Sequence, residues 1–344
     1  MTSSAEGKPR GACTRAGEDA AARADGREAP SRVVFHRHYR QFRGGHLKVF
    51  HYFEHVRSSP SYDARIRFSS DSVWDASNPW WGLPETVIGP QQAEDADVLF
   101  LAGIDWRSLE PGRRAASRVP IVNLMQDFRA TRPGAPLHEF LAHRAIRVCV
   151  TPEIAQALRD IGTVPGPILT VPVGIDLDAL PAPRPAGERD IDCVVLAVKD
   201  AKLGGAIAGR LRAGGHRVLL VDRSLPREQL LAAMARARVA VHLPASIEGA
   251  YMPALESMAL GALVVCPDCL GNRSFCRDGE TCLVPKRSAR AIVKATLTAL
   301  AASPEELEPM LAAARRESAE HALARERSRF LAVLDRVDEL WAAD

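Results

Sequence analysis

Two glutamates in the second half of the chain, Glu248 and Glu256, are separated by seven residues in a largely apolar segment. This segment, VHLPASIEGAYMPALESMALGALVVCPDCL from Val241 to Leu270, predicts a strand, a polar turn, a helix with Pro253 in its first turn and another buried strand. The backbone N–H groups of such a turn and the positive end of the helix dipole suit an anion such as a diphosphate. A carboxylate at Glu256 would then accept hydrogen bonds from both hydroxyls of a ribose.

A structural interpretation of the same glutamates competes with this one. Glu248 would be a turn residue and Glu256 a solvated helix residue, which is the usual situation of two unrelated glutamates. The neighbouring residues favour a binding site instead: Leu243-Pro244, Ser246, Glu248-Gly249, Pro253, Leu255-Glu256, Met258-Ala259, Gly261 and Val264-Val265. Together they resemble the donor-binding signature of the GT-B glycosyltransferases of family 4, a retaining type with two glutamates at this spacing.

The resemblance covers most of the chain, from about Val33 to Ala302. Other matching segments follow the order of the family: Gly44-Gly45 before the first helix, Val171–Asp176 at the entry to the second domain, and Asp278-Gly279 with Leu283-Val284 after the last strand. The resemblance implies an α/β protein of the GT-B fold. In that fold two Rossmann-like parallel-sheet domains face a cleft, and C-terminal helices pack back on the domains.

The resemblance also implies roles for individual residues around the two glutamates. Glu248 would contact hydroxyls of the donor sugar and take part in catalysis, and Glu256 would hold the ribose. The backbone of the intervening turn would lie against the diphosphate and the sugar, through Gly249, Ala250, Tyr251 and Met252.

Positive charge and close backbone approach are expected from other loops. Lys199 and Lys202 follow the first strand of the second half and would neutralise the diphosphate, with Lys199 stabilising it as it departs. The arginine that accompanies this lysine in the family is absent. Gly44 and Gly45 lack side chains, so their backbone could approach a donor phosphate at a helix N-terminus. Both pairs also have an ordinary interpretation, as exposed lysines and as loop glycines.

The sequence departs from the family pattern in two further places. After Glu248 the family usually has glycine, an aromatic residue and glycine, whereas this chain has Gly249-Ala250-Tyr251. In the first domain a histidine-aspartate pair is common near the primary alcohol of the sugar, and this chain has Gln126-Asp127. Gln126 can hydrogen-bond a hydroxyl of the substrate, but it cannot shuttle a proton.

Metal chemistry has less support. Four cysteines, Cys266, Cys269, Cys276 and Cys282, have a zinc-like spacing, but Cys266 ends a predicted buried strand and the stretch aligns with a loop that the family builds without metal. Asp190 and Asp192 form the Asp-x-Asp motif of a different glycosyltransferase fold, but they precede a strand, which is the wrong structural context. We therefore expect neither a metal nor a cofactor.

The elements that must position these residues follow from hydrophobic patterning. Short β-branched runs alternate with helical stretches, which predicts parallel sheets covered by helices. The predicted strands are Arg32–His36, Asp63–Ser69, Asp97–Ala102, Pro120–Met125, Arg147–Thr151, Ile168–Val171, Ile191–Val198, His216–Asp222, Val239–Leu243 and Ala262–Cys266. The predicted helices are His46–Arg57, Leu137–Ala145, Pro152–Ile161, Ala206–Ala213, Arg227–Ala237, Pro253–Leu260 and Ala289–Ala302.

A length of 344 residues favours two domains. Residues 1–31 lack core-forming side chains and are predicted to be a disordered tail. Residues 32–177 would form the acceptor-side domain, the proline-rich stretch 178–189 the linker, and residues 190–303 the donor domain. Residues 304–344 carry helical spacing and should pack as helices on a domain surface.

The composition is that of a globular protein, with 47% hydrophobic and 25% charged residues. A net charge of +3 does not favour a nucleic-acid partner. The chain has no run of about 18 apolar residues and no apolar core of a signal peptide near its start, so we expect a cytoplasmic protein without a transmembrane segment. Peripheral contact with a membrane stays open.

The sequence therefore predicts a retaining, hexosyltransferase-like enzyme that moves a sugar from a nucleoside-diphosphate sugar to a hydroxyl of a small-molecule or glycan acceptor. Two alternatives stay open: a nucleotide-sugar epimerase or GT-B-like coupling enzyme, and a non-catalytic nucleotide-sugar-binding protein. A dehydrogenase is disfavoured because no Gly-x-Gly-x-x-Gly follows a predicted strand. The base and sugar of the donor, the acceptor and the oligomeric state cannot be read from the sequence.

Overall fold

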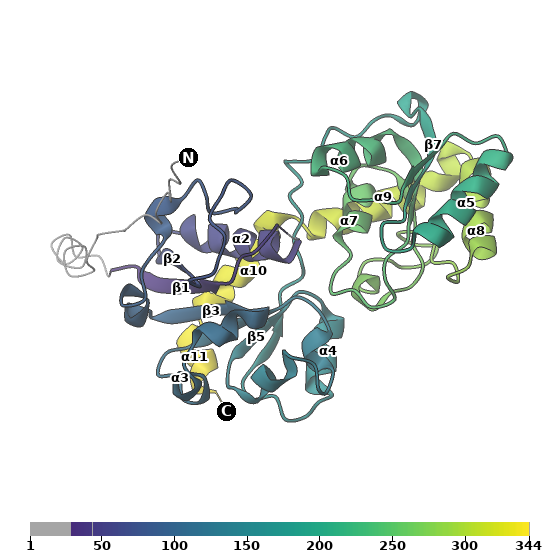
Figure 1. The fold of residues 1–344 in the computed structure, drawn as a ribbon. Coiled ribbons are helices and arrows are strands. Elements are labelled where there is room, and N and C mark those ends of the chain that lie inside the picture. The colour runs from purple at the N-terminus through teal and green to yellow at the C-terminus, as the bar shows by residue number, and fades with distance from the viewer. Residues whose placement is uncertain (1–28, 43, 344) are drawn as a thin grey trace, which may run out of the picture. The chain divides into compact units, whose positions relative to one another are not determined.

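The computed structural model describes residues 29–42 and 44–343 (Figure 1), so most of the predicted tail lies outside the described residues. The chain forms two compact units. Unit 1 comprises the chain up to Cys149, Ala155–Val171 and Arg327–Asp344, and unit 2 comprises Val150–Ile154 and Pro172–Glu326. The boundary at Val171 precedes the predicted linker. The structure assigns residues 178–189 to unit 2, where Leu180 packs against the core.

Unit 1 is built on a parallel sheet with strand order β2-β1-β3-β4-β5-β6. The strands are β1 (Ser31–Arg37), β2 (Tyr62–Phe68), β3 (Val98–Ala102), β4 (Ile121–Met125), β5 (Ile146–Cys149) and β6 (Ile168–Thr170). The helices are α2 (Gly44–Arg57), α3 (Pro111–Ala115) and α4 (Pro152–Arg159), joined from the C-terminal end by α10 (Leu323–Leu334) and α11 (Val337–Ala342). Strands β3, β4 and β5 are buried throughout, as a sheet covered on both faces requires.

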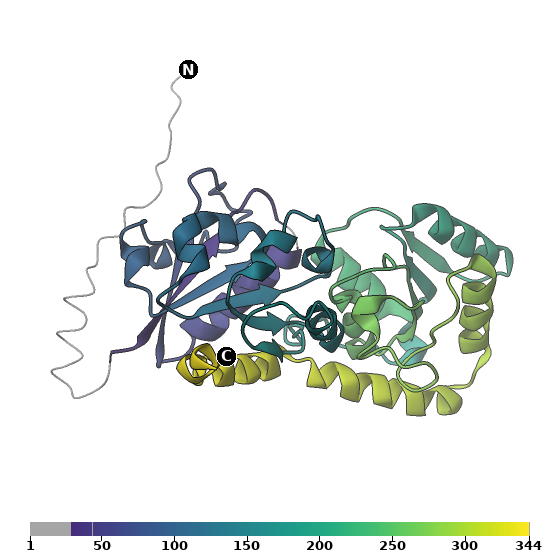
Figure 2. The same cartoon turned by 90° about the horizontal axis from the view of Figure 1, so that it is seen from below.

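The C-terminal helices α10 and α11 return to unit 1, where Figure 2 shows them running beneath the sheet. Phe330 of α10 packs edge-on against Tyr52 of α2, with ring centroids 4.6 Å apart, and against Phe100 of β3 at 5.8 Å. Trp341 of α11 packs against the core cluster around Trp106. The spacing of apolar residues at this end of the chain therefore reflects packing on unit 1.

Unit 2 contains a second parallel sheet with strand order β10-β9-β7-β8. Its strands are β7 (Ile191–Leu196), β8 (Val218–Val221), β9 (Ala237–His242) and β10 (Leu263–Val265). Its helices are α5 (Ala201–Ala213), α6 (Arg227–Arg236), α7 (Met252–Ala259), α8 (Ala289–Ala301) and α9 (Pro304–Glu320). Alternate residues of β7 enter two separate core clusters, Cys193 and Val195 in one and Val194 and Leu196 in the other.

Each predicted strand is present, but two helix predictions were wrong. The stretch Leu137–Ala145 forms only a short 3₁₀ helix, His138–Ala142, because the carbonyls of Phe140 and His143 accept hydrogen bonds from the buried Arg147 guanidinium. Helix α5 begins five residues before its predicted start, at Ala201, after Asp200 has capped the Leu203 N–H at 3.2 Å. Gly204 is required in α5 because a Cβ would lie 2.1 Å from that of Ala197.

Candidate functional site

The loop between β9 and α7, residues 243–251, is fixed by its backbone. The Tyr251 N–H donates to the Gly271 carbonyl at 3.0 Å, and the Leu270 N–H donates to the Ser246 carbonyl at 3.4 Å. Gly271 lies so close that an added Cβ would stand 2.4 Å from the Glu248 carbonyl oxygen. We call Cys269–Asn272 the clamp segment. No side chain caps the start of α7; Pro253 has no N–H and the Ala254 N–H donates to the Tyr251 carbonyl at 3.2 Å, which leaves the Met252 N–H for an anion.

Glu248 and Lys199 meet at the open side of this loop. The Lys199 Nζ lies 2.5 and 2.6 Å from the two carboxylate oxygens, and the Ala245 N–H donates to the same carboxylate at 2.7 Å. The Lys199 side chain is 48% exposed and that of Glu248 only 13%. The structure thus brings together the two residues that the sequence placed in catalysis, and it pairs them with each other.

Glu256 lies on α7 and is not a solvated helix residue. Its side chain is 4% exposed, and its Oε1 lies 2.7 Å from Nη1 of Arg227 at the start of α6. Arg227 was missed in the sequence because no motif marks it. Only the tertiary packing of α6 against α7 reveals the pair.

The side chain of Tyr251, at the end of the loop, packs into the interior. The ring is 8% exposed, and its centroid lies 5.6 Å from that of the buried His242 in an edge-on contact. Burial raises the pKa of the Tyr251 hydroxyl well above its usual value, and burial lowers that of His242 to about 3. The ring packs inward, Gly249 is buried, and Ala250 and Met252 are partly exposed.

The other predicted basic residue of this unit is placed differently. Lys202 is exposed on the first turn of α5 and forms no ion pair with any described residue. Arg287, which the sequence did not single out, donates to the Pro244 carbonyl at 2.5 Å and to Asp200 at 3.0 Å. Since Asp200 adjoins Lys199, Arg287 ties the lysine-bearing turn to the start of the β9–α7 loop.

In unit 1 the structure brings Gly45 and Gln126 together. Gly44 and Gly45 open α2, and a Cβ on Gly45 would stand 3.4 Å from Oε1 of Gln126 at the end of β4. Gly44 has open space around it. A side chain amide therefore lies beside an exposed helix start, at the carboxyl end of the parallel strands, where open α/β sheets bind ligands.

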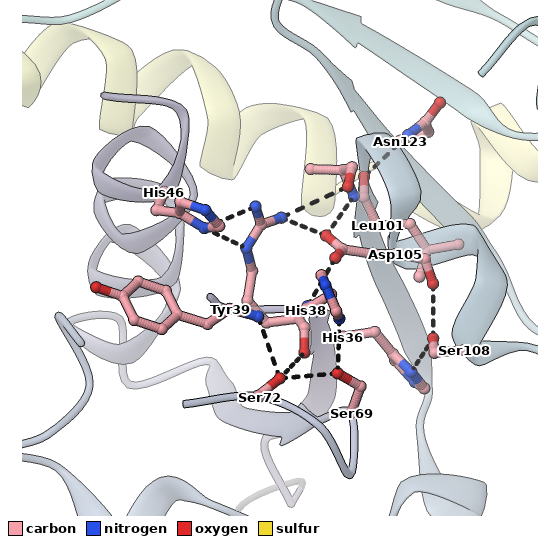
Figure 3. Close-up of polar contacts among 12 residues, drawn as sticks. His36, His38, Tyr39, His46, Ser69, Ser72, Leu101, Asp105, Ser108 and Asn123 are labelled. Carbon is pink, nitrogen blue, oxygen red and sulfur yellow. Dashed lines mark hydrogen bonds and ion pairs between the residues drawn. The ribbon is translucent and has the colours of Figure 1, made fainter. Parts of the chain in front are cut away.

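A buried polar network lies next to this point (Figure 3). Arg37, at the end of β1, forms a hydrogen-bonded ion pair with Asp105, and its Nε donates to Nδ1 of His46 on α2 at 3.1 Å. Asp105 also accepts from the backbone N–H groups of His38 and Ala102, at 3.0 and 3.1 Å. Burial raises the pKa of Asp105, although Arg37 opposes this shift. The network therefore ties the ends of β1 and β3 to α2.

The residues considered for metal binding have other roles. In the described ranges, no group of three or more His, Cys, Asp or Glu side chains is arranged to hold a metal ion. Asn272 donates to Cys266 Sγ at 3.2 Å and accepts from the Cys269 N–H at 3.1 Å, which supports the clamp segment. The Asp-x-Asp carboxylates pair with arginines instead, Asp190 with Arg236 and Asp192 with Arg217.

Comparison with known proteins gives one family match and several solved structures of similar fold. Residues 177–302 match the family described as Glycosyl transferases group 1. No curated protein matches the chain in sequence. Among solved structures, sucrose-phosphate synthase from Thermosynechococcus elongatus is similar with a TM-score of 0.67 and 15% identity, over 90% of this chain and 99% of that one. Anabaena HepE in complex with UDP gives 0.68 and 12%, over 88% and 99%.

A glycosyltransferase from Rickettsia africae is also similar, with a TM-score of 0.64 and 9% identity over 90% of this chain and 99% of that one. These likenesses confirm the predicted two-domain GT-B fold. The family match over residues 177–302 lies within unit 2. Among the helices described, none is long and apolar enough to cross a membrane.

Proposed function

We propose that this chain is a retaining glycosyltransferase that moves a sugar from a nucleoside-diphosphate sugar to a hydroxyl of an acceptor. The observation that carries the proposal is the convergence of Lys199, Glu248 and the uncapped start of α7 on one loop of unit 2. Anabaena HepE, which shares the fold, was solved in complex with UDP-glucose, and this supports a donor of that class.

Each group around the loop has a defined task. Glu256 accepts hydrogen bonds from the ribose hydroxyls, and the N–H of Met252, the first residue of α7, faces the diphosphate. When the bond between the sugar and the diphosphate breaks, the diphosphate leaves with the electron pair, and Lys199 stabilises its charge. The acceptor hydroxyl attacks the same face of the sugar, so the anomeric configuration is kept, and its proton passes to the departing phosphate.

The Lys199–Glu248 pair is suited to exchange partners when the donor arrives. Lys199 would turn to the diphosphate, and Glu248 would turn to hydroxyls of the sugar. Because the lysine is half-exposed, separating the pair costs only about 0–1 kcal/mol. The pair thus holds the loop in shape before binding and supplies both charges afterwards.

In unit 1, Gln126 and the start of α2 are proposed to serve the hydroxyl-bearing substrates. The side chain amide of Gln126 can both donate and accept, so it can orient a hydroxyl, although it cannot carry the proton away. Gly44 and Gly45 leave the backbone of the helix start open to a phosphate oxygen. The assignment of Gln126 predicts an effect on turnover, not on affinity for a free nucleotide.

The test uses nucleoside diphosphates alone, without the unknown acceptor. Thermal stabilisation by UDP, GDP, ADP, CDP and dTDP identifies the base, and calorimetry then compares variants. Glu256→Ala should weaken nucleotide binding about tenfold or more, since charge-assisted hydrogen bonds contribute roughly 1.5–3 kcal/mol each. Glu248→Ala should bind the nucleotide as the parent does and turn over the nucleotide sugar more slowly. Glu228→Ala, on the exposed face of α6, is the matched control.

Two outcomes would contradict the proposal. If Glu256→Ala binds every nucleotide as the parent does, the donor-site assignment fails. If the protein binds a nucleotide sugar and only isomerises it, with no transfer or slow hydrolysis to the free sugar, the epimerase alternative holds. Once a product is obtained, NMR of its anomeric proton decides between retention and inversion.

A further inference from the structure

The Glu256 side chain is almost fully buried, yet its carboxylate has few partners within the described chain. Its side chain is 4% exposed, and Arg227 is the one ion-pair partner that the described chain provides. No backbone or side-chain group in the described ranges donates it a further hydrogen bond. Buried carboxylates are normally both paired and hydrogen-bonded, because losing water costs them several kcal/mol. The remaining acceptor capacity of Glu256 is therefore unexplained by the fold alone.

Arg227 occupies a position that the helix itself disfavours. It is the first residue of α6, where the helix dipole is positive and a cation is destabilising by about 0.3–1 kcal/mol. Its side chain is 44% exposed but reaches Glu256 on the neighbouring helix, with 2.7 Å between Nη1 and Oε1. The dipole of its own helix disfavours this arginine, and its charge is directed at the buried carboxylate of Glu256. We therefore assign Arg227 a role toward that carboxylate.

We propose that Arg227 is a positioning residue of the nucleotide site: it holds the Glu256 carboxylate turned so that its unfilled acceptor positions receive the ribose hydroxyls. The inference rests on the proposed function and deepens it. It makes Arg227, through Glu256, a determinant of the choice between ribose and 2′-deoxyribose. Because the guanidinium fixes one oxygen of the carboxylate, the carboxylate cannot turn to a new position when only the 3′-hydroxyl is present. A 2′-deoxy nucleotide therefore leaves one acceptor position of Glu256 unpaired.

The positive charges near the two glutamates come from different elements. The arginine expected beside Lys199 after β7 is absent from the sequence. Arg227 brings a guanidinium to the same unit from α6, where it pairs with Glu256 of α7. Positive charge is thus divided between Lys199 for Glu248 and Arg227 for Glu256.

The experiment measures affinity for UDP, ADP and GDP and for their 2′-deoxy counterparts by calorimetry. Arg227→Met should weaken binding of the ribonucleotide about tenfold and bring the ribose-to-deoxyribose ratio close to one. Arg227→Lys, which keeps the charge, should restore affinity to within about threefold of the parent. In the double variant Arg227→Met/Glu256→Gln, the loss should be no greater than in Glu256→Gln alone, because both changes remove one interaction.

Arg236→Met is the matched control, since Arg236 also lies on α6 and pairs with an exposed carboxylate, Asp190. Arg236→Met should leave the nucleotide affinity and the ratio of ribonucleotide to deoxyribonucleotide affinity unchanged. If Arg227→Met matches the parent while Glu256→Ala loses affinity, the role of Arg227 is overturned and the proposed function stands. A loss of affinity with an unchanged sugar ratio also overturns it, because Arg227 would then contact another part of the nucleotide. If Glu256→Ala also binds the nucleotides as the parent does, the proposed function is wrong, and the role of Arg227, which rests on it, is wrong as well.

Discussion

The ion pairs described at the candidate sites of the two units differ in exposure, although both sites lie at the carboxyl ends of parallel strands. In unit 2, Lys199 and Arg227 are each nearly half-exposed while their glutamate partners are largely buried. In unit 1, Arg37 is 9% exposed and Asp105 not at all. A pair with one solvated member can exchange that member for a ligand at small cost, whereas opening a buried pair strands a charge. The first arrangement suits binding, and the second holds loops in place.

The largest effect is expected from breaking the buried pair. Asp105→Asn leaves the Arg37 guanidinium uncompensated in the interior and weakens the acceptor of two backbone N–H groups. The free energy of unfolding should fall by about 3–5 kcal/mol, measured in urea. Asp71→Asn is the control, because Asp71 pairs with Arg40 at the surface. This variant should change the free energy of unfolding by no more than about 0.5 kcal/mol. Equal effects of the two changes would remove the distinction between the units.

A second prediction concerns the clamp segment in unit 2. Gly271→Ala would place a Cβ 2.4 Å from the Glu248 carbonyl oxygen, so the β9–α7 loop must shift. We expect a loss of about 1–3 kcal/mol in unfolding free energy and weaker nucleotide binding, measured by thermal unfolding with and without nucleotide. Gly209→Ala is the matched change, since nothing lies within 4 Å of a Cβ there, and on helix α5 it should be neutral or slightly stabilising. Unaltered binding by Gly271→Ala would show that the clamp does not shape the loop.

A third prediction concerns two buried histidines, one in each unit. His36 in β1 contacts Ser108 through Nδ1 at 2.6 Å, and Ser108 donates to the Asp105 carbonyl, so His36 must donate from Nδ1 and leave Nε2 bare. His242 contacts Ser257 at 3.0 Å, and its Nδ1 has no partner among the described residues. Burial, chiefly, lowers the pKa of both rings from 6.5 to about 3.

The sign of the pH effect follows from these values. Between pH 6.5 and about 3 the unfolded chain takes up protons that the folded rings cannot, so stability is highest above pH 6.5 and falls as the pH decreases. His36→Gln and His242→Gln should each reduce the loss between pH 7 and pH 5 by on the order of 1–2 kcal/mol, measured by urea unfolding at both pH values. If both variants keep the pH dependence of the parent, the rings are not buried in neutral form.

The sequence predicted the strands well because a sheet covered on both faces leaves near-continuous apolar runs, as in Val194–Leu196. It also brought Lys199 and Glu248 into one proposal, because a motif marks their loops. Arg227 and Gly271 could not be found in this way. Their importance lies in contacts between segments distant in sequence, a guanidinium reaching another helix and a backbone too close for a side chain.

The smallest effect should separate the two lysines of unit 2. Lys199→Met removes the charge beside Glu248 and leaves that carboxylate facing the diphosphate, so nucleoside-diphosphate affinity should fall about threefold to tenfold. Lys202→Met is the matched change three residues on; its side chain is exposed on α5 and pairs with no described residue, so we expect at most about a twofold loss. Neither change should alter the free energy of unfolding by more than about 1 kcal/mol, because both lysines are solvated. Calorimetry on both variants, with circular dichroism to establish folding, makes the comparison. Equal losses would place both lysines on the diphosphate and make the ion pair with Glu248 irrelevant to binding. No loss in either would leave the start of α7 as the anion site without a cationic partner.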